Sequence, residues 1–311
     1  MTDALVRTVD PRFRPAGRTY PQIWSSLLAR GGIGKTAFTT SMTVTLALRG
    51  YQITVWDLDQ QCNASSGLGW GPQEIGSRPT ILDFILGDAS YEEVRVQARY
   101  KLAQGVDHEG NEFVEWMDIP NLYLMPATEF LTNADTLLTQ TEHAHRYSWF
   151  KDFLRDEYDG DDDMFFIDNP ANYGKLVGTV AMMMDEHDEV IPTCLASSKA
   201  VEGIPSLIKE LSRLREQFSK SKAIPGRPTV KRIPLIGVQT GSRAEADNRK
   251  SVLEMEELYP ELVKDWPYIR YSATAKTSFR DHLPLPIQAP NSPAVEDYRK
   301  LATAWGFPDL E

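Results

Sequence analysis

Short apolar runs alternate with longer amphipathic segments along most of the chain. The short runs are rich in β-branched and aromatic residues, which is typical of buried strands, whereas the longer segments have helical character. The expected strands are residues 23–28, 51–58, 122–125, 164–167, 190–195 and 235–240. The expected helices are residues 35–48, 129–139, 204–218 and 243–258. This alternation predicts βαβ units, and therefore an α/β fold with a mostly parallel twisted sheet and helices on both faces.

The pattern predicts a single domain over residues 22–307, preceded by a flexible basic arm over residues 1–21. The arm lacks the apolar core of a secretory signal, contains three prolines, and carries Arg7, Arg12, Arg14 and Arg18. One interpretation of the arm is an unstructured leader, and the other is a basic arm that touches DNA or a partner.

Two segments look like additions to the domain. Residues 90–118 are charged and irregular, with a turn expected at residues 108–111. Residues 219–232 form a basic loop without an acidic residue, holding Lys220, Lys222, Arg227, Lys231 and Arg232. Such a loop is either a solvated connection or a contact surface for a phosphate backbone.

Composition narrows the functional classes. The 311 residues include 33 Lys and Arg against 44 Asp and Glu, a net charge of −11, so bulk charge does not drive binding to DNA or to anionic membranes. Two cysteines, Cys62 and Cys194, cannot build a disulfide framework or a four-ligand zinc site, which fits a reducing cytosol. No run reaches the roughly 18 consecutive apolar residues of a membrane helix.

The strongest chemical signal is the loop A-R-G-G-I-G-K-T at residues 29–36, between the first expected strand and the first long helix. Its glycines, Gly31, Gly32 and Gly34, allow a tight turn that aims successive N–H groups inward, where the positive end of the helix dipole also points. Lys35 can reach the β- and γ-phosphates of a nucleotide, and Thr36 can offer its hydroxyl to Mg²⁺. The alternative is a glycine-rich turn with a coincidental Lys-Thr pair.

Three carboxylates follow two of the expected strands. Asp57 and Asp59 stand at the carboxyl end of the strand over residues 51–58, and Asp168 follows the apolar run 165–167. Ligands of open α/β sheets bind outside that edge. One carboxylate there can hold a Mg²⁺-bound water, and another can position the water that attacks a γ-phosphate. The alternative is a polar exit from strand to loop.

Together these segments resemble the ParA/Soj/MinD family of deviant Walker A ATPases. The family loop K-G-G-x-G-K-T is matched by residues 30–36, its D-x-D-P-Q-G-N run by residues 57–63, and its D-x-P by residues 168–170. Weaker similarity covers residues 82–87, 121–127, 201–203 and 272–276, so the resemblance extends from about residue 22 to residue 305. The D-x-D-x-Q-x-N run, and the lack of a clear basic amphipathic tail, place the chain closer to plasmid and chromosome partition ATPases than to MinD.

The resemblance implies a P-loop NTPase fold that uses ATP and Mg²⁺. Lys35 is similar to the family's phosphate-binding lysine, and Asp59 to the catalytic carboxylate that positions water. Thr36, Asp57 and Asp168 are similar to the residues of the Mg²⁺ site. The nucleotide-binding loop is expected to comprise Gly31, Gly32, Ile33, Gly34, Lys35, Thr36 and Ala37.

Three departures from the family pattern change these expectations. Arg30 replaces the signature lysine that reaches the other subunit's phosphates. Because Arg keeps the charge but substitutes a planar fork for a compact ammonium, two alternatives stay open: a catalytic role in trans, or a slower or altered cycle. Thr240 and Gly241 stand where the family often reads adenine with Asn, which leaves base selectivity open. Gln60 and Cys62 replace Pro and Gly, which predicts a differently shaped loop.

The family implies a homodimer in the ATP state that binds non-specific DNA and is released when a ParB-like DNA-binding activator stimulates hydrolysis. Candidate DNA contacts are Arg243, Arg249, Lys250 and Arg270, for which solvated helix charges are the plainer interpretation. The arm is too short for a helix-turn-helix domain, so sequence-specific operator binding is not expected. The expected location is the cytoplasm, on the nucleoid in the ATP state, without stable membrane association.

The sequence thus favours an ATPase switch for plasmid or chromosome partition. Three alternatives remain at this point. They are an ATPase that positions a protein cargo or a membrane site, a metabolic phosphate-loop enzyme acting on a small molecule, and a nucleotide-dependent interaction module that hydrolyses poorly.

Overall fold

The computed structural model describes residues 13–14, 17–106, 108–140, 148–222, 224–241, 245–263, 265–278 and 281–310. Its strands are β1 (Gln22–Ser26), β2 (Ile53–Asp57), β3 (Val96–Val106), β4 (Glu112–Met125), β5 (Met164–Asp168), β6 (Glu189–Ile191), β7 (Cys194–Leu195), β8 (Leu235–Val238) and β9 (Ile269–Arg270). The helices of the first half are α1 (Lys35–Leu48), α2 (Asn63–Gly67), α3 (Pro72–Ile75), α4 (Ile81–Leu86), α5 (Tyr91–Val94), η1 (Glu129–Asn133), α6 (Ala134–Leu137), α7 (Trp149–Asp152) and η3 (Phe153–Glu157). Those of the second half are α8 (Lys175–Met183), α9 (Ser198–Val201), α10 (Ile204–Phe218), α11 (Ala246–Leu258), α12 (Pro260–Val263), η4 (Thr274–Lys276), α13 (Leu285–Gln288) and α14 (Pro293–Ala304).

A six-stranded sheet with the order β3-β4-β2-β5-β1-β6 forms the centre of the molecule. Its strands pair in parallel except β3 and β4, so the predicted mostly parallel sheet is confirmed. A smaller parallel sheet, β7-β8-β9, continues the arrangement. The strand predicted over residues 190–195 is divided between the two sheets, because Pro192 has no N–H to donate to a strand ladder.

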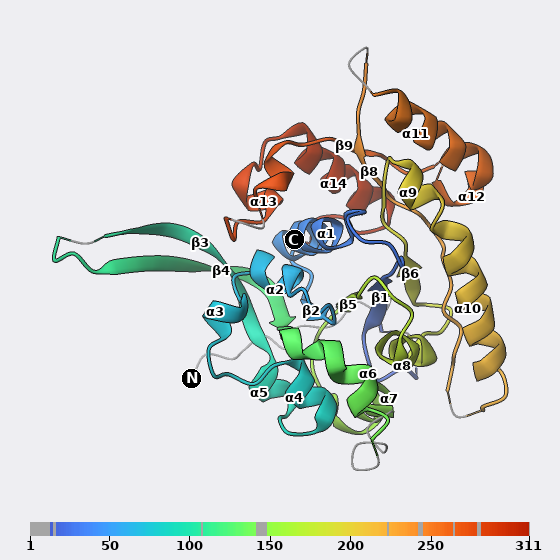
Figure 1. The fold of residues 1–311 in the computed structure, drawn as a ribbon, viewed down its shortest axis with the longest axis horizontal. Coiled ribbons are helices and arrows are strands. Elements are labelled where there is room, and N and C mark those ends of the chain that lie inside the picture. Colours follow the sequence, from blue (N-terminus) through green and yellow to red (C-terminus); the bar gives the residue numbers. More distant parts are fainter. Residues whose placement is uncertain are drawn as a thin grey trace.

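Alternating side chains of the central strands fill two separate cores, one on each face of the sheet. Phe165 and Ile167 join the core beneath α4, α7, α8 and α10, whereas Phe166 between them joins the core beneath α1 and α14. Ile23 and Trp24 divide between the two cores in the same way. Figure 1 shows the helices on either side of the sheet. The prediction of helices on both faces is therefore confirmed, and none of the described helices is long and apolar enough to cross a membrane.

The prediction of an irregular segment over residues 90–118 is wrong. After the short helix α5, the chain forms a long antiparallel hairpin, β3–β4, that projects from the body (Figure 1). The predicted turn coincides with the hairpin's turn at residues 108–110. Two register shifts, between Gln97 and Arg99 and between Lys101 and Ala103, interrupt the alternation of apolar and polar residues that identifies strands in a sequence.

The described part of residues 1–21 is packed against the domain, so the expected flexible arm is not found there. Phe13 is only 3% exposed and packs between the rings of Tyr51 and Phe307, at centroid distances of 5.5 and 5.2 Å. Arg14 donates a hydrogen bond to the carbonyl oxygen of Gly160 at 2.8 Å. The segment is docked because the aromatic side chain of Phe13 is buried in the core. The preceding residues, with Arg7 and Arg12, lie outside the described residues.

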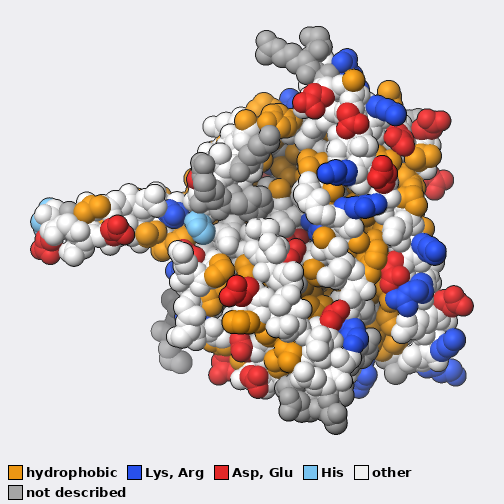
Figure 2. Space-filling view, in the orientation of Figure 1, with side chains coloured by type: hydrophobic (Ala, Val, Ile, Leu, Met, Phe, Trp, Pro, Cys, Tyr) orange, Lys and Arg blue, Asp and Glu red, His pale blue; other side chains and the backbone are white. Residues whose placement is uncertain are grey.

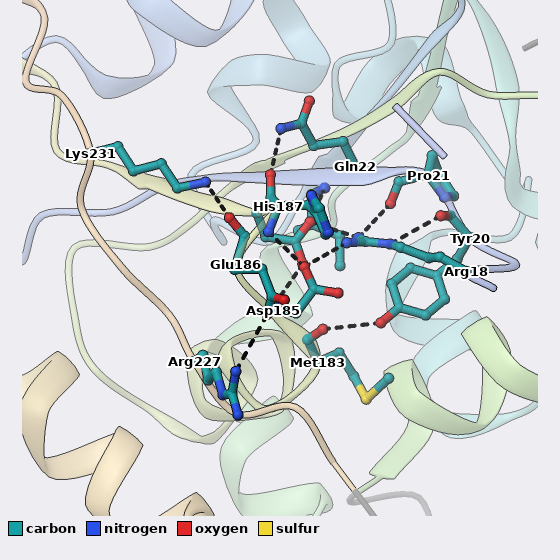
Figure 3. Close-up of polar contacts among 12 residues, drawn as sticks. Arg18, Tyr20, Pro21, Gln22, Met183, Asp185, Glu186, His187, Arg227 and Lys231 are labelled. Carbon is teal, nitrogen blue, oxygen red and sulfur yellow. Dashed lines mark hydrogen bonds and ion pairs between the residues drawn. The ribbon is translucent and has the colours of Figure 1, made fainter. Parts of the chain in front are cut away.

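Arg18 anchors the same segment to the loop before β6 (Figure 3). Its guanidinium pairs with Asp185 at 2.8 Å and with Asp188 at 2.6 Å, and Asp188 also accepts the backbone N–H of Ile23 at 2.7 Å. Burial raises the pKa of Asp188 to about 6, while the Arg18 charge acts in the opposite direction. Arg18 therefore compensates a carboxylate at the edge of β1, and this pairing fixes where the first strand begins.

The basic loop over residues 219–232 is partly neutralised by acids of the same region. Arg232 pairs with Glu189 at 2.8 Å and lies over the rings of Trp24 and Trp305. Lys231 donates to the Glu186 carbonyl oxygen (Figure 3). Lys220 and Lys222 are exposed. The choice between a solvated connection and a contact surface for a phosphate backbone therefore concerns mainly Lys220 and Lys222.

Replacing Phe13 by Ala tests whether the N-terminal segment is part of the folded domain. Phe13→Ala removes a buried ring and should lower the free energy of unfolding by about 3 kcal/mol, whereas Phe130→Ala, at a ring that is 63% exposed, should change it by less than about 0.5 kcal/mol. Urea denaturation followed by circular dichroism measures both. Equal midpoints for the two variants would show that Phe13 is not docked.

Candidate functional site

The loop between β1 and α1 has the backbone of a phosphate cradle. Gly32 and Gly34 have φ angles of 70° and 88°, in the left-handed region that favours glycine. A Cβ atom at Gly34 would lie 2.3 Å from Cδ1 of Ile236, so neither the angle nor the space there suits another residue. The loop leads directly into α1, whose first N–H groups and positive dipole end face the same region.

Lys35 begins α1 and is held over the loop. It is 7% exposed, and its Nζ donates to the carbonyl oxygens of Leu28 and Arg30, both at 3.1 Å. Burial lowers the pKa of Lys35, while the charges of Asp168 and Asp59 act in the opposite direction. A cation held by two loop carbonyls can exchange them for phosphate oxygens without a large movement of the backbone.

Asp168 ends β5 and receives hydrogen bonds from α1. Thr36 Oγ1 donates to one carboxylate oxygen at 2.8 Å, and Thr39 Oγ1 donates to the other at 3.1 Å. Asp168 is fully buried. Burial raises the pKa of this carboxyl group, against the Thr36 hydrogen bond and the Lys35 charge. Thr36 and Asp168, both expected from the sequence at the Mg²⁺ site, are thus in direct contact.

Asp57 ends β2 directly beside Asp168, because the two residues are partners in the parallel ladder between β2 and β5. Its carboxylate accepts the backbone N–H and the hydroxyl of Ser65 at 2.8 and 2.7 Å, and the backbone N–H of Asp59 at 3.1 Å. Burial first, and then the charge of Asp168, raise the pKa of Asp57. Two adjacent buried carboxylates repel each other, so a cation at this edge would stabilise both ionised forms.

These residues suit Mg²⁺ better than a metal that needs a closed protein cage. Among the described residues there is no group of three or more His, Cys, Asp or Glu that could hold a metal ion by itself. Mg²⁺ characteristically takes one or two protein oxygens and completes its shell with water and phosphate oxygens. The Thr36 hydroxyl and the carboxylates of Asp168 and Asp57 provide oxygen ligands of that kind.

Asp59 lies two residues beyond the end of β2, and its carboxylate is half-buried. Its Oδ1 accepts the backbone N–H of Gln61 at 3.0 Å. In the same loop, Cys62 has a φ angle of 52°, so a cysteine adopts the left-handed conformation at the position where the family has glycine. The loop therefore places Cys62 in a backbone conformation that favours glycine.

A cavity of about 710 Å³ lies at the phosphate loop, and neither Asp57 nor Asp168 belongs to its lining. It is lined by every residue of the predicted nucleotide loop from Gly31 to Ala37 and by Asp59. The wall also includes residues that the sequence did not single out, among them Ser41, Ile236, Gly237, Ile269, Tyr271 and Tyr298. Most of them lie on β8 and β9 or directly after them, and β9 is only two residues long. The segment over residues 272–276, which the sequence did single out, contributes Ser272 and Ala275 to the same wall.

Arg30 does not belong to the wall of this cavity, although it precedes Gly31. Its side chain is exposed, and its stem passes close to Gly203, the residue before α10, where a Cβ atom would lie 3.2 Å from Arg30 Cγ. The Arg30 side chain therefore lies outside the cavity wall, although the Arg30 carbonyl oxygen accepts a hydrogen bond from Lys35 Nζ within the loop.

The four candidate DNA contacts do not form one group. Arg249 and Lys250 are exposed on α11. Arg270 lines the large cavity and a second one beside it, and pairs with Asp297 at 2.7 Å. Arg243 lies outside the described residues. Thr240 lines the second cavity, of about 700 Å³, with Gln239 and Tyr271.

Comparison with known proteins agrees with this geometry. A family model described as an AAA domain matches residues 23–224, which is more than half of the chain. The chromosome partitioning protein ParA of Caulobacter vibrioides is 26% identical over 198 residues, covering 63% of this chain and 64% of ParA. The chain therefore matches less than two thirds of the length of this relative.

Solved structures share the fold over nearly the whole chain. A complex of McdA from Cyanothece with ATP superposes with a TM-score of 0.67 at 17% identity, covering 93% of this chain and 98% of McdA. Cobyrinic acid a,c-diamide synthase from Mycobacterium smegmatis, with a bound ATP analogue and magnesium, gives a TM-score of 0.61 at 20% identity, covering 84% of this chain and 91% of the synthase. At these identities the similarity shows a common fold.

Proposed function

Because the chain belongs to the ParA/MinD family of P-loop ATPases, we propose that it is a Mg²⁺-ATP-dependent switch for DNA partition. In the ATP state it would form a homodimer on non-specific DNA, and a ParB-like activator would release it by stimulating hydrolysis. The observation that carries the proposal is that Lys35, Thr36 and Asp59 line one cavity at a glycine-rich loop, while Thr36 donates a hydrogen bond to the buried Asp168.

Each side chain has a part in binding or hydrolysis that its surroundings support. The loop N–H groups and Lys35 would bind the phosphates, and Thr36, Asp57 and Asp168 would hold Mg²⁺. Bound Mg²⁺ neutralises the negative charge of the phosphates. Asp59 would position the attacking water, since its carboxylate lines the cavity and is held by the Gln61 N–H.

The position of Arg30 supports the proposed dimer. A guanidinium that is exposed beside α10, outside the cavity of its own chain, is free to serve the nucleotide of a second subunit. In P-loop enzymes, an arginine supplied in trans can stabilise the charge of the transition state. We propose that Arg30 acts in this way in place of the family's lysine.

A second candidate function is the positioning of a protein cargo. Helix α11 carries Arg249 and Lys250 but also Asp247, Glu254, Glu256 and Glu257, so its charge is 2 − 4 = −2. A helix of this composition repels a phosphate backbone on average, and Arg270 is already paired with Asp297. Both observations argue against DNA binding by these residues, and neither concerns the nucleotide site.

DNA retention tests the proposed function. With Mg²⁺-ATP the protein should retain random-sequence duplex DNA, with Mg²⁺-ADP it should not, and raising the salt from about 50 mM to about 200 mM should weaken retention roughly tenfold or more. Asp59→Ala should bind ATP normally, hydrolyse it poorly and stay on DNA. Lys35→Ala, which loses phosphate binding, is the matched negative control. Absence of retention in both nucleotide states would favour a protein cargo instead.

Mixing two inactive variants tests Arg30 in trans. Arg30→Ala and Asp59→Ala should each hydrolyse ATP poorly alone. An equimolar mixture should recover about a quarter of wild-type turnover, since half of randomly formed dimers are mixed and each contains one complete site. The measurement is steady-state phosphate release at fixed total protein. A mixture no more active than its components would place Arg30 in its own subunit's site or outside catalysis.

A further inference from the structure

The outer half of the β3–β4 hairpin stands apart from the rest of the sheet. Among the described strands, β3 is an edge strand that pairs with β4 alone, and β4 pairs with β2 only over Leu122–Met125. Over residues 102–106 and 112–118, the two strands therefore pair with each other alone in the described part of the chain. Figure 1 shows this ribbon extending well beyond the body. Two-stranded ribbons are marginal without a covering layer, so a ribbon of this length is suited to receive one.

Large apolar side chains are concentrated on this ribbon. Five of the twelve exposed large hydrophobic residues in the described chain belong to it: Leu102, Val106, Phe113, Val114 and Met117, which are 44 to 63% exposed. The pairing alternates them between the two faces, with Phe113 opposite Gly105 and Val114 opposite Gln104. Apolar surface gathered on one projecting element marks an interaction site rather than scattered exposure.

Charge selects the class of partner. Residues 102–116 contain Asp107, Glu109, Glu112 and Glu115 but neither lysine nor arginine. In Figure 2 the β3–β4 ribbon carries orange and red side chains, and the dark blue of Lys and Arg appears only where the ribbon joins the body. A negative ribbon repels both a phosphate backbone and an anionic membrane, whereas it attracts a basic protein segment.

The base of the ribbon is held firmly to the body. The Arg99 guanidinium lies between two indole rings, 3.7 Å from the centroid of Trp70 and 4.4 Å from that of Trp116. Backbone N–H groups of Arg99 and Lys101 donate to Leu68 and His282 at 3.1 and 3.2 Å. The base of the β3–β4 ribbon therefore has a fixed orientation on the body, which reduces the entropy lost on binding.

We propose that the outer ribbon of the β3–β4 hairpin is a docking arm for a protein partner whose binding segment is basic and apolar. Such a segment pairs its cations with Glu112 and Glu115 and packs its apolar side chains on Phe113 and Val114. The two free strand edges allow it to add as a further strand. This role is separate from nucleotide chemistry and stands whether or not the chain hydrolyses ATP.

Fluorescent eight-residue peptides of alternating residues test the chemistry directly with the full chain. A lysine–valine peptide should bind at least about tenfold more tightly than a glutamate–valine peptide, by fluorescence anisotropy, and its affinity should fall with salt. Phe113→Ser and the pair Glu112→Lys with Glu115→Lys should each weaken its binding about fivefold or more. Equal binding of the two peptides, or unchanged binding to these variants, would overturn the proposal.

Matched controls separate the arm from general effects. Phe130→Ser removes a ring that is 63% exposed, against 45% for Phe113, and the pair Glu257→Lys with Glu261→Lys reverses exposed acids elsewhere; both should bind the peptide like the wild type. Thermal melting confirms that all variants are folded. Sedimentation of the protein alone identifies a rival occupant: oligomers that the hairpin variants abolish would assign the arm to a second copy of the chain and overturn the proposal. Loss of DNA retention in the hairpin variants would overturn it as well.

Discussion

Two carboxylates of like charge lie side by side at the carboxyl edge of the sheet, and the rest of the site is organised around them. Asp57 and Asp168 are ladder partners and are fully buried, so each raises the cost of ionising the other. Protein groups compensate only in part: Lys35 contributes one positive charge, and Thr36, Thr39 and Ser65 donate hydrogen bonds. A site of this kind gains most from binding a divalent cation together with a phosphate chain.

The fold serves this arrangement through the two cores. Because β1, β2 and β5 send alternate side chains into opposite layers, their carboxyl ends are fixed from both faces. Arg18 fixes β1 from its other end by compensating Asp188. The loop that carries Gly34 and Lys35 therefore connects two elements, β1 and α1, that are both packed into the core. Pre-organisation of this kind lets backbone N–H groups act on a phosphate without a large reordering cost.

Most of the fold and the centre of the site could be predicted from the sequence, because both depend on local patterns. The bounds of α1 and α10 match their predictions, and the glycine loop with Asp57 and Asp168 lies where strand ends meet. Features that depend on tertiary contacts could not be predicted. Phe13 looks like part of a basic leader until Tyr51 and Phe307 enclose it. The hairpin is obscured by its register shifts, and the cavity wall at Tyr271 depends on a strand of two residues.

Proton release on nucleotide binding tests the central claim most directly. If Mg²⁺-ATP binds beside Asp57 and Asp168, the Mg²⁺ charge lowers their raised pKa values, so the proton that Asp57, with a pKa of about 8, holds near neutral pH is released. Calorimetric titration with preformed Mg²⁺-ATP at pH 7.5, in two buffers of different ionisation enthalpy, measures that release. The account predicts net release that Asp57→Asn reduces and that vanishes as the pH is raised further. Binding with the same heat in both buffers and no dependence on Mg²⁺ would contradict it.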